Sequence, residues 1–242
     1  MSTAPAPAPT LADALLRPIL FADAARPLVT YYDDLTGERV EVSGTTLANW
    51  AAKTANLLRD ELGVRPGDPV AVLLPAHWQS VAVHLGVWWC GGVVVADPDG
   101  AEVALCTVER LPEAEAAPEV AVLSLDAFGR GVDGLAIGIT DYATAVRVHG
   151  DAFVPTPVPG DAPALEEHSV EEVLASARAS AASQGLTAQD RVLSSASWDT
   201  TDGLVDGLLA VLAAGASLVQ VARPDHALLA RRVTTEKVTR QL

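Results

Sequence analysis

The sequence predicts an α/β protein of two similar layered halves, each with a mostly parallel sheet flanked by helices. Three observations favour this fold class. Apolar runs such as PVAVLLP and VVVADP alternate with helical segments, as parallel strands and their crossover helices require. The order of helix, strand, helix, strand occurs twice along the chain. Of the 242 residues, 50% are hydrophobic, which is enough for a large buried core.

The first elements lie before the clearer of the two repeats. Residues 1–10 alternate proline with alanine and predict a disordered tail. Residues 11–21, LADALLRPILF, predict a short amphipathic helix that Pro18 perturbs. The segments PLVTYYDD and RVEVSG alternate in polarity on either side of DLTGE, so they predict a β-hairpin.

The first repeat begins at Ser43, which we expect to cap a helix that continues to about Leu62 and ends at Gly63. A turn at VRPGD then leads to the strand PVAVLLP, a helix over about residues 78–90 and the strand VVVADP. The SGTT at 43–46 is similar to the core of a phosphate-binding loop. Its place directly before a helix favours the capping role.

The second repeat follows at a constant spacing. Three residues stand 122 positions after their counterparts, namely Gly185 after Gly63, Asp190 after Asp68, and Val192 after Val70. GLVDGLLAVLAAGASLVQV then matches VAVHLGVWWCGGVVVA with a shift of one position. Because parallel strands need right-handed crossovers, we expect helices on both faces of each sheet.

The segment between the repeats suggests the domain organisation. EVALCTVERL and EVAVLSL predict two further strands, and FGRGVDGLAIGITDY predicts a loop. FVPTPVPGDAP holds four prolines that keep it extended, as a linker or as a proline-directed docking peptide. The predicted domains are a tail at 1–10, a first α/β subdomain at 11–150, a proline-rich linker at 151–163 and a second, incomplete α/β subdomain at 164–242.

The charge of the chain excludes several partners. A formal net charge of −15 repels phosphate backbones and anionic lipids, so we expect neither nucleic acid nor a membrane as partner. The sequence shows no secretory signal pattern and no apolar run long enough to span a bilayer, so we expect a cytoplasmic location.

The reactive residue types form no recognisable motif. Cys90 and Cys106 lack CxxC spacing and predict buried free thiols. No GxSxG, GxGxxG or GxxxxGK[ST] motif is present, and Ser194, Ser195 and Ser197 predict a turn at a strand end. We expect no catalytic residue, no metal and no cofactor. The five histidines are dispersed without metal-ligand spacing: His77, His84, His149, His168 and His226.

One loop is a candidate ligand site. It is the acidic loop WDTTDG, which follows a strand and whose Asp199 and Asp202 are suited to a cation or a polar ligand, and ligands of α/β folds commonly bind at the carboxyl ends of strands. The alternative interpretation is that these acids are simply solvated. The predicted ligand-binding residues are Trp198, Asp199, Thr200 and Asp202.

Trp88 and Trp89 are adjacent residues of one predicted helix. Their side chains therefore point about 100° apart, so we expect one of them to lie at an interface.

Two long segments resemble the adenylate-forming enzymes, the superfamily of acyl-CoA synthetases, luciferases and peptide-synthetase adenylation domains. The first is LANWAAKTANLLRDELGVRPGDPVAVLLPAHWQSVAVHLGVWWCGGVVVADP, and the second is LASARASAASQGLTAQDRVLSSASWDTTDGLVDGLLAVLAAGASLV. The resemblance extends from about Leu11 to Val238 and implies the fold of the N-terminal portion of those enzymes. More narrowly, the chain resembles a small actinobacterial family of truncated relatives.

The resemblance also implies missing parts. In those enzymes the strand matched by APAL leads into a Gly-, Ser- and Thr-rich loop ending in Pro-Lys-Gly, which binds phosphate. Here Leu165 is followed at once by Glu166 and Glu167, whose carboxylates would oppose a triphosphate. Thr200 stands where the enzymes have a histidine. The chain ends before the ribose-binding aspartate and the C-terminal domain with its catalytic lysine would occur.

The sequence therefore supports two hypotheses about function. The first is a non-catalytic, degenerate acyl-CoA synthetase-like pseudoenzyme that binds a small molecule or a protein and forms a homo-oligomer. The alternative is a ligase-like protein that still binds or activates an acyl or nucleotide substrate with parts from another chain.

Overall fold

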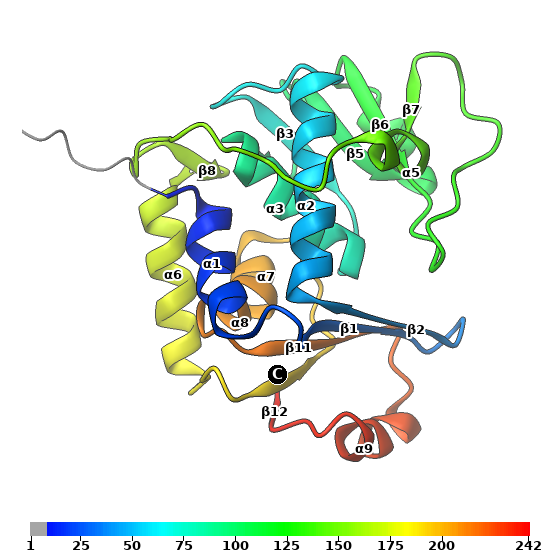
Figure 1. Ribbon diagram of the computed structural model, residues 1–242. Coiled ribbons are helices and arrows are strands. Elements are labelled where there is room, and N and C mark those ends of the chain that lie inside the picture. Colours follow the sequence, from blue (N-terminus) through cyan, green and yellow to red (C-terminus); the bar gives the residue numbers. More distant parts are fainter. Residues whose placement is uncertain (1–8) are drawn as a thin grey trace, which may run out of the picture.

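The computed structural model describes residues 9–242 and places several helices between two sheets (Figure 1). Most of the tail predicted at 1–10 lies outside the described residues. Thr10 caps the first helix, because its hydroxyl accepts a hydrogen bond from the Asp13 N–H at 3.1 Å. The mixed α/β architecture with parallel sheets flanked by helices confirms the predicted fold class.

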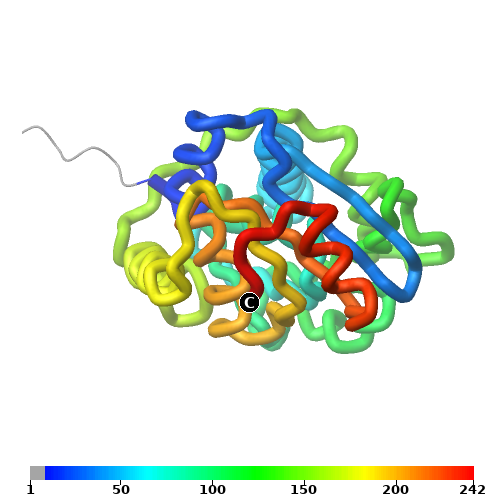
Figure 2. Tube along the Cα trace, turned by 90° about the horizontal axis from the view of Figure 1, so that it is seen from below, coloured from blue at the N-terminus to red at the C-terminus, as the bar shows by residue number. Residues whose placement is uncertain are grey.

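The first sheet has five strands in the order β12-β10-β11-β1-β2. Figure 2 shows the red C-terminal end of the chain beside the yellow segment, in agreement with the pairing of β12 with β10. The strands β1 and β2 pair antiparallel, which confirms the predicted hairpin. The strand β1 then pairs parallel with β11, with Val29 opposite Leu218. The bounds are β1 Pro27–Asp33, β2 Glu38–Ser43, β10 Arg191–Ser194, β11 Ser217–Ala222 and β12 Arg240–Gln241.

The second sheet has seven strands in the order β7-β6-β5-β3-β4-β8-β9. All neighbours pair parallel except β8 and β9. The two strands predicted between the repeats are present as β5 and β6. The bounds are β3 Pro69–Leu73, β4 Val93–Val95, β5 Val103–Thr107, β6 Glu119–Leu123, β7 Ile139–Asp141, β8 Pro163–Leu165 and β9 His168–Ser169.

The helices between the sheets form the core. The helix α3 is buried on every side and contacts α1, α2, β1 and β3, as expected of a helix that is apolar all round. In residues 9–242, no helix combines the length and the apolarity that crossing a bilayer requires. The long helices are α1 Leu11–Asp23, α2 Gly44–Asp60, α3 Trp78–Cys90, α6 Val170–Ser183 and α9 His226–Thr235.

The remaining helical segments are short. The segments α7 and α8 join through a π-helical turn into one longer helix. The bounds are α4 Leu111–Ala114, α5 Tyr142–Ala145, α7 Thr201–Leu204, the π-helical turn Val205–Leu209 and α8 Ala210–Ala213, with 3₁₀ turns at Val108–Arg110 and Val146–Val148.

The two predicted repeats have the same local geometry. Gly63 and Gly185 both have positive φ, 73° and 66°, at the ends of α2 and α6. The Asp68 carboxylate accepts a hydrogen bond from the Arg65 N–H at 2.8 Å. The equivalent carboxylate, that of Asp190, accepts one from the Thr187 N–H at the same distance. The repeated turn explains why both halves pass from helix to buried strand in the same way.

Each sheet takes strands from both of the predicted subdomains. The hairpin β1–β2 lies beside β11, and the pair β8–β9 lies beside β4. Such long-range pairing depends on tertiary packing, which local patterns do not report. The division of the chain into 11–150 and 164–242 stays a prediction.

Both adjacent tryptophans of α3 are buried, so the prediction that one of them lies at an interface is wrong. Trp88 donates its indole N–H to the Ala164 carbonyl oxygen at 2.7 Å, and Trp89 donates to the Asp13 carboxylate at 3.2 Å. Because α3 has neighbours on all sides, the two diverging rings each meet an intramolecular partner.

Candidate functional site

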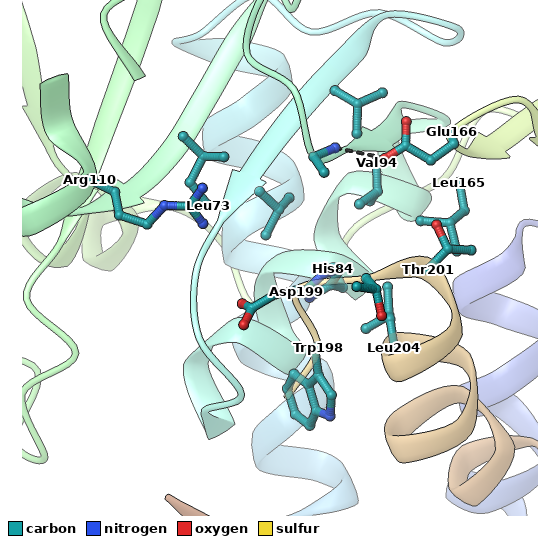
Figure 3. Close-up of a pocket in the computed structure, with 14 residues that line it drawn as sticks. Leu73, His84, Val94, Arg110, Leu165, Glu166, Trp198, Asp199, Thr201 and Leu204 are labelled. Atoms are coloured by element: carbon teal, nitrogen blue, oxygen red, sulfur yellow. Dashed lines mark hydrogen bonds between the residues drawn. The ribbon is translucent and has the colours of Figure 1, made fainter. Parts of the chain in front are cut away.

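A cavity of about 590 Å³ opens at the carboxyl ends of β3, β4 and β8 (Figure 3). The loop between β10 and α7 closes it from the other sheet. This is the edge at which parallel sheets commonly bind ligands. Half of its lining residues are aliphatic: Val72, Leu73, Val94, Val95, Ala96, Leu165 and Leu204.

His84 supplies a neutral hydrogen-bond acceptor to this cavity. Its side chain, which is 4% exposed, places Nδ1 2.7 Å from the Ser80 carbonyl oxygen. Since a carbonyl oxygen can only accept, Nδ1 holds the proton and Nε2 keeps a lone pair. Burial lowers the pKa of His84 to about 4, although the bond to Ser80 acts in the opposite direction. The imidazole is therefore uncharged at neutral pH.

Trp198 packs beside His84, and its indole ring meets the imidazole edge-on with ring centroids 6.5 Å apart. Gly207, in the π-helical turn, lies against the same indole. A Cβ at Gly207 would stand 3.1 Å from the Trp198 Nε1, so only glycine allows this approach without a shift. Within the described part of the chain, the indole N–H has no hydrogen-bond partner.

The turn between β8 and β9 adds a carboxylate. Glu166 adopts a positive φ of 51°, and its Oε1 accepts a hydrogen bond from the Ala96 N–H at 2.8 Å (Figure 3). The helix α6 begins at Val170, after a capping box formed by Ser169 and Glu172. The strand thus reaches the helix without a glycine-rich loop, as the sequence predicts.

The rim of the cavity is polar and mainly acidic. Asp199 accepts a hydrogen bond from the Ser197 hydroxyl. Thr200 caps α7 by accepting a hydrogen bond from the Gly203 N–H at 3.1 Å. Among residues 9–242, Arg110 is the one cation in the lining, and its guanidinium already pairs with Glu113 at 2.7 Å. With two carboxylates against one paired guanidinium, the lining favours neutral or cationic ligands over anions.

Three of the four residues predicted to bind a ligand line this cavity: Trp198, Asp199 and Thr200. The fourth, Asp202, is exposed on the first turn of α7 and is not part of the lining. The sequence reasoning missed the contributions of His84 and Arg110. These two residues come from other elements, and no spacing in the sequence relates them to the loop at Trp198.

Cys90 and Cys106 are buried free thiols, as predicted. Burial raises the pKa of Cys90 to about 12 and that of Cys106 to about 11, so both keep their protons at neutral pH. Among residues 9–242, no three or more His, Cys, Asp and Glu side chains are grouped so that they could hold a metal ion.

Comparison with known proteins supports the family and the fold of this chain. A family model described as AMP-binding enzyme matches residues 22–106. A Mycobacterium tuberculosis protein described as a TIGR03089 family protein is 62% identical over 240 residues, which cover 96% of this chain and 98% of the relative.

Solved structures share the fold at low identity. The acyl-CoA synthetase of Brucella canis is 18% identical with a TM-score of 0.82, and the match covers 100% of this chain and 48% of that protein. The acetoacetyl-CoA synthetase from Streptomyces lividans is 21% identical with a TM-score of 0.76, and the match covers 96% and 42%. The chain therefore spans about half the length of these solved synthetases or less.

Proposed function

Because this chain belongs to the TIGR03089 family and has the fold of the N-terminal part of acyl-CoA synthetases, we propose that it is a non-catalytic binding protein. In this proposal it keeps the scaffold of the adenylate-forming enzymes and binds a small molecule in the cavity that Trp198 lines. Activation of an acyl group with ATP is not part of the proposal.

The turn at Glu166 is the observation that supports this proposal most directly. A phosphate group needs converging N–H donors and positive charge. At the end of β8 the chain instead presents the Glu166 carboxylate, which already accepts a hydrogen bond from the Ala96 N–H. Glu167 follows at once, so a triphosphate placed there would meet two negative charges.

The cavity itself supports binding of a compact, uncharged ligand. Its volume of about 590 Å³ lies in the usual range for small-molecule sites. The apolar wall favours burial of a hydrocarbon or aromatic part. The neutral His84 and the carboxylate of Asp199 are acceptors, so the ligand is expected to offer hydrogen-bond donors.

The proposal predicts that nucleotides do not bind. We expect isothermal titration of the purified chain with ATP, AMP and an acyl-CoA to show no binding at micromolar concentrations, because Glu166 and Glu167 oppose phosphate groups. We also expect no release of pyrophosphate from ATP. An active acyl-CoA synthetase serves as the positive control. Micromolar ATP binding would instead support the alternative of a ligase-like protein completed by another chain.

A second prediction concerns the cavity. A ligand that binds only the folded chain raises its melting temperature, so a thermal-shift screen of uncharged anilines, alcohols and amides should find ligands. We expect Thr201→Trp, which fills the rim, to remove the shift. The matched control Asp202→Asn changes the next, exposed residue and should keep it. A ligand that stabilises both variants equally does not use this cavity.

A further inference from the structure

A second hollow lies between the hairpin β1–β2 and the loops that follow β5 and β6. Its volume is about 1160 Å³, and it adjoins the first cavity through Arg110 and Asp199, which line both. Figure 1 shows the hairpin β1–β2 reaching out from the lower sheet. Neither the proposed function nor the resemblance assigns a role to this groove.

Two polar side chains on this groove each have a buried atom without a hydrogen-bond partner among residues 9–242. His77 is 2% exposed, and its Nδ1 accepts a hydrogen bond from the Gln79 N–H at 3.1 Å. The remaining ring nitrogen, Nε2, therefore holds the proton and is a donor. It lies 3.7 Å from Oε1 of Glu38, and both atoms are buried without a hydrogen-bond partner among residues 9–242.

Tyr31 completes the group. Its ring meets the His77 imidazole edge-on with ring centroids 4.3 Å apart. Burial raises the pKa of Tyr31 to about 12 and nearby Glu38 adds to the rise, whereas Arg223 acts against it. The phenol is therefore protonated at neutral pH, and it lines the same hollow as Glu38 and His77.

The arginines that line this groove are already paired with acids, Arg110 with Glu113 among them. Arg223 pairs with Asp33, Arg130 with Asp126 at 2.8 Å, and Arg39 with Glu236 at 3.0 Å. The acids Glu109 and Asp199 are exposed to solvent, which leaves one buried N–H donor beside one buried carboxylate oxygen. Buried polar atoms without partners are rare because they are unfavourable, so a missing partner is the natural explanation.

A ligand group that satisfies both atoms must accept a hydrogen bond from the His77 Nε2–H and donate one to the Glu38 carboxylate. An anion would meet the Glu38 carboxylate, and a cation would face the His77 N–H. A primary carboxamide offers a carbonyl oxygen and an N–H side by side and is uncharged. We propose that Glu38, His77 and Tyr31 form a binding site for the carboxamide group of a small ligand.

Three probes of matched shape test this proposal, namely benzamide, benzoate and benzamidine, which are neutral, anionic and cationic. We expect nuclear magnetic resonance titration of the full chain to show benzamide binding at least roughly tenfold more tightly than either charged probe. Binding should also shift the His77 Nε2–H resonance. Equal affinities, or no binding of benzamide, would overturn the proposal and leave a bound water as the partner of these atoms.

Variants locate the binding. We expect Glu38→Leu to weaken benzamide binding roughly tenfold or more, since it removes the carboxylate acceptor. Tyr31→Phe, which removes only a hydroxyl, should weaken it less and guards against a folding defect in the first variant. Glu109→Gln, on the same groove, is the matched control. Unchanged binding by Glu38→Leu would contradict the proposal, and loss of binding in Thr201→Trp would assign benzamide to the first cavity instead.

Discussion

Replacing Glu236 with glutamine is expected to lower the free energy of unfolding by about 3 to 5 kcal/mol at pH 7. The Glu236 side chain is 5% exposed and accepts hydrogen bonds from the Tyr32 hydroxyl at 2.5 Å, from Arg39 at 3.0 Å and from Arg191. These bonds join the end of α9 to the hairpin and to β10. A neutral amide leaves the half-buried Arg191 guanidinium with only the more distant Glu41 carboxylate, at 3.6 Å, as its counterion. Urea denaturation of both proteins measures the difference.

The same carboxylate predicts a pH dependence. Burial raises the pKa of Glu236, but hydrogen bonds from Tyr32, Arg191 and Arg39 outweigh burial and lower it to about 2, from a usual value of 4.5. A lowered pKa means that the carboxylate stabilises the fold above pH 4.5 and loses this contribution as pH falls toward 2. The contribution is about 3 kcal/mol. The difference in stability between wild type and Glu236→Gln should therefore shrink over this interval.

An exposed ion pair provides the control. Glu113 pairs with Arg110 at the surface, where solvent screens the interaction. We expect Glu113→Gln to leave the unfolding midpoint nearly unchanged and without the pH dependence described above. If both substitutions destabilise the chain equally, burial of the Glu236 cluster is not the cause.

The local elements of this fold could be predicted because their signals are local. Ser43 accepts a hydrogen bond from the Thr46 N–H at 3.1 Å and so caps α2, as its place before an apolar helix indicates. Gly63 ends the same helical segment with a positive φ. These features depend on residues a few positions apart in the chain. They can therefore be predicted from one sequence without knowledge of the fold.

The pairing of distant strands could not be predicted in this way. The hairpin β1–β2 joins β11 through the parallel register of Val29 with Leu218. Nothing within either strand selects that partner, since β propensity and alternation describe a strand but not its neighbour. The prediction of two sheets was right, whereas their strand composition required the three-dimensional structure.

The candidate sites, too, could be predicted from the sequence only in part. The loop at Trp198 could be predicted because it follows a strand end, but His84 lies on a different helix. The partnerless pair of Glu38 and His77 combines a hairpin strand with the cap of α3. A dispersed histidine in the sequence gives no sign of a buried carboxylate beside it. Geometry, rather than motif, makes these groups candidates.

Replacing Gly86 with valine is expected to lower the free energy of unfolding by about 3 kcal/mol, because α2 and α3 are in close contact at this residue. A Cβ at Gly86 would lie 2.7 Å from the Thr54 Cβ and 3.1 Å from the Ala51 carbonyl oxygen. Both neighbours are part of α2, which is fixed between the sheets. The added side chain must therefore push α3 away.

A shift of α3 also reaches both candidate sites, because His84 lies within this helix and His77 caps its first turn. We expect Gly86→Val to weaken binding in the cavity and in the groove, as thermal shift and benzamide titration would measure. Gly150→Ala is the control, since a Cβ there meets only atoms at 3.9 Å or more. That variant should change the unfolding free energy by less than about 0.5 kcal/mol. If Gly86→Val melts like wild type, the helix contact is looser than the structure indicates, and α3 does not hold the two histidines in place.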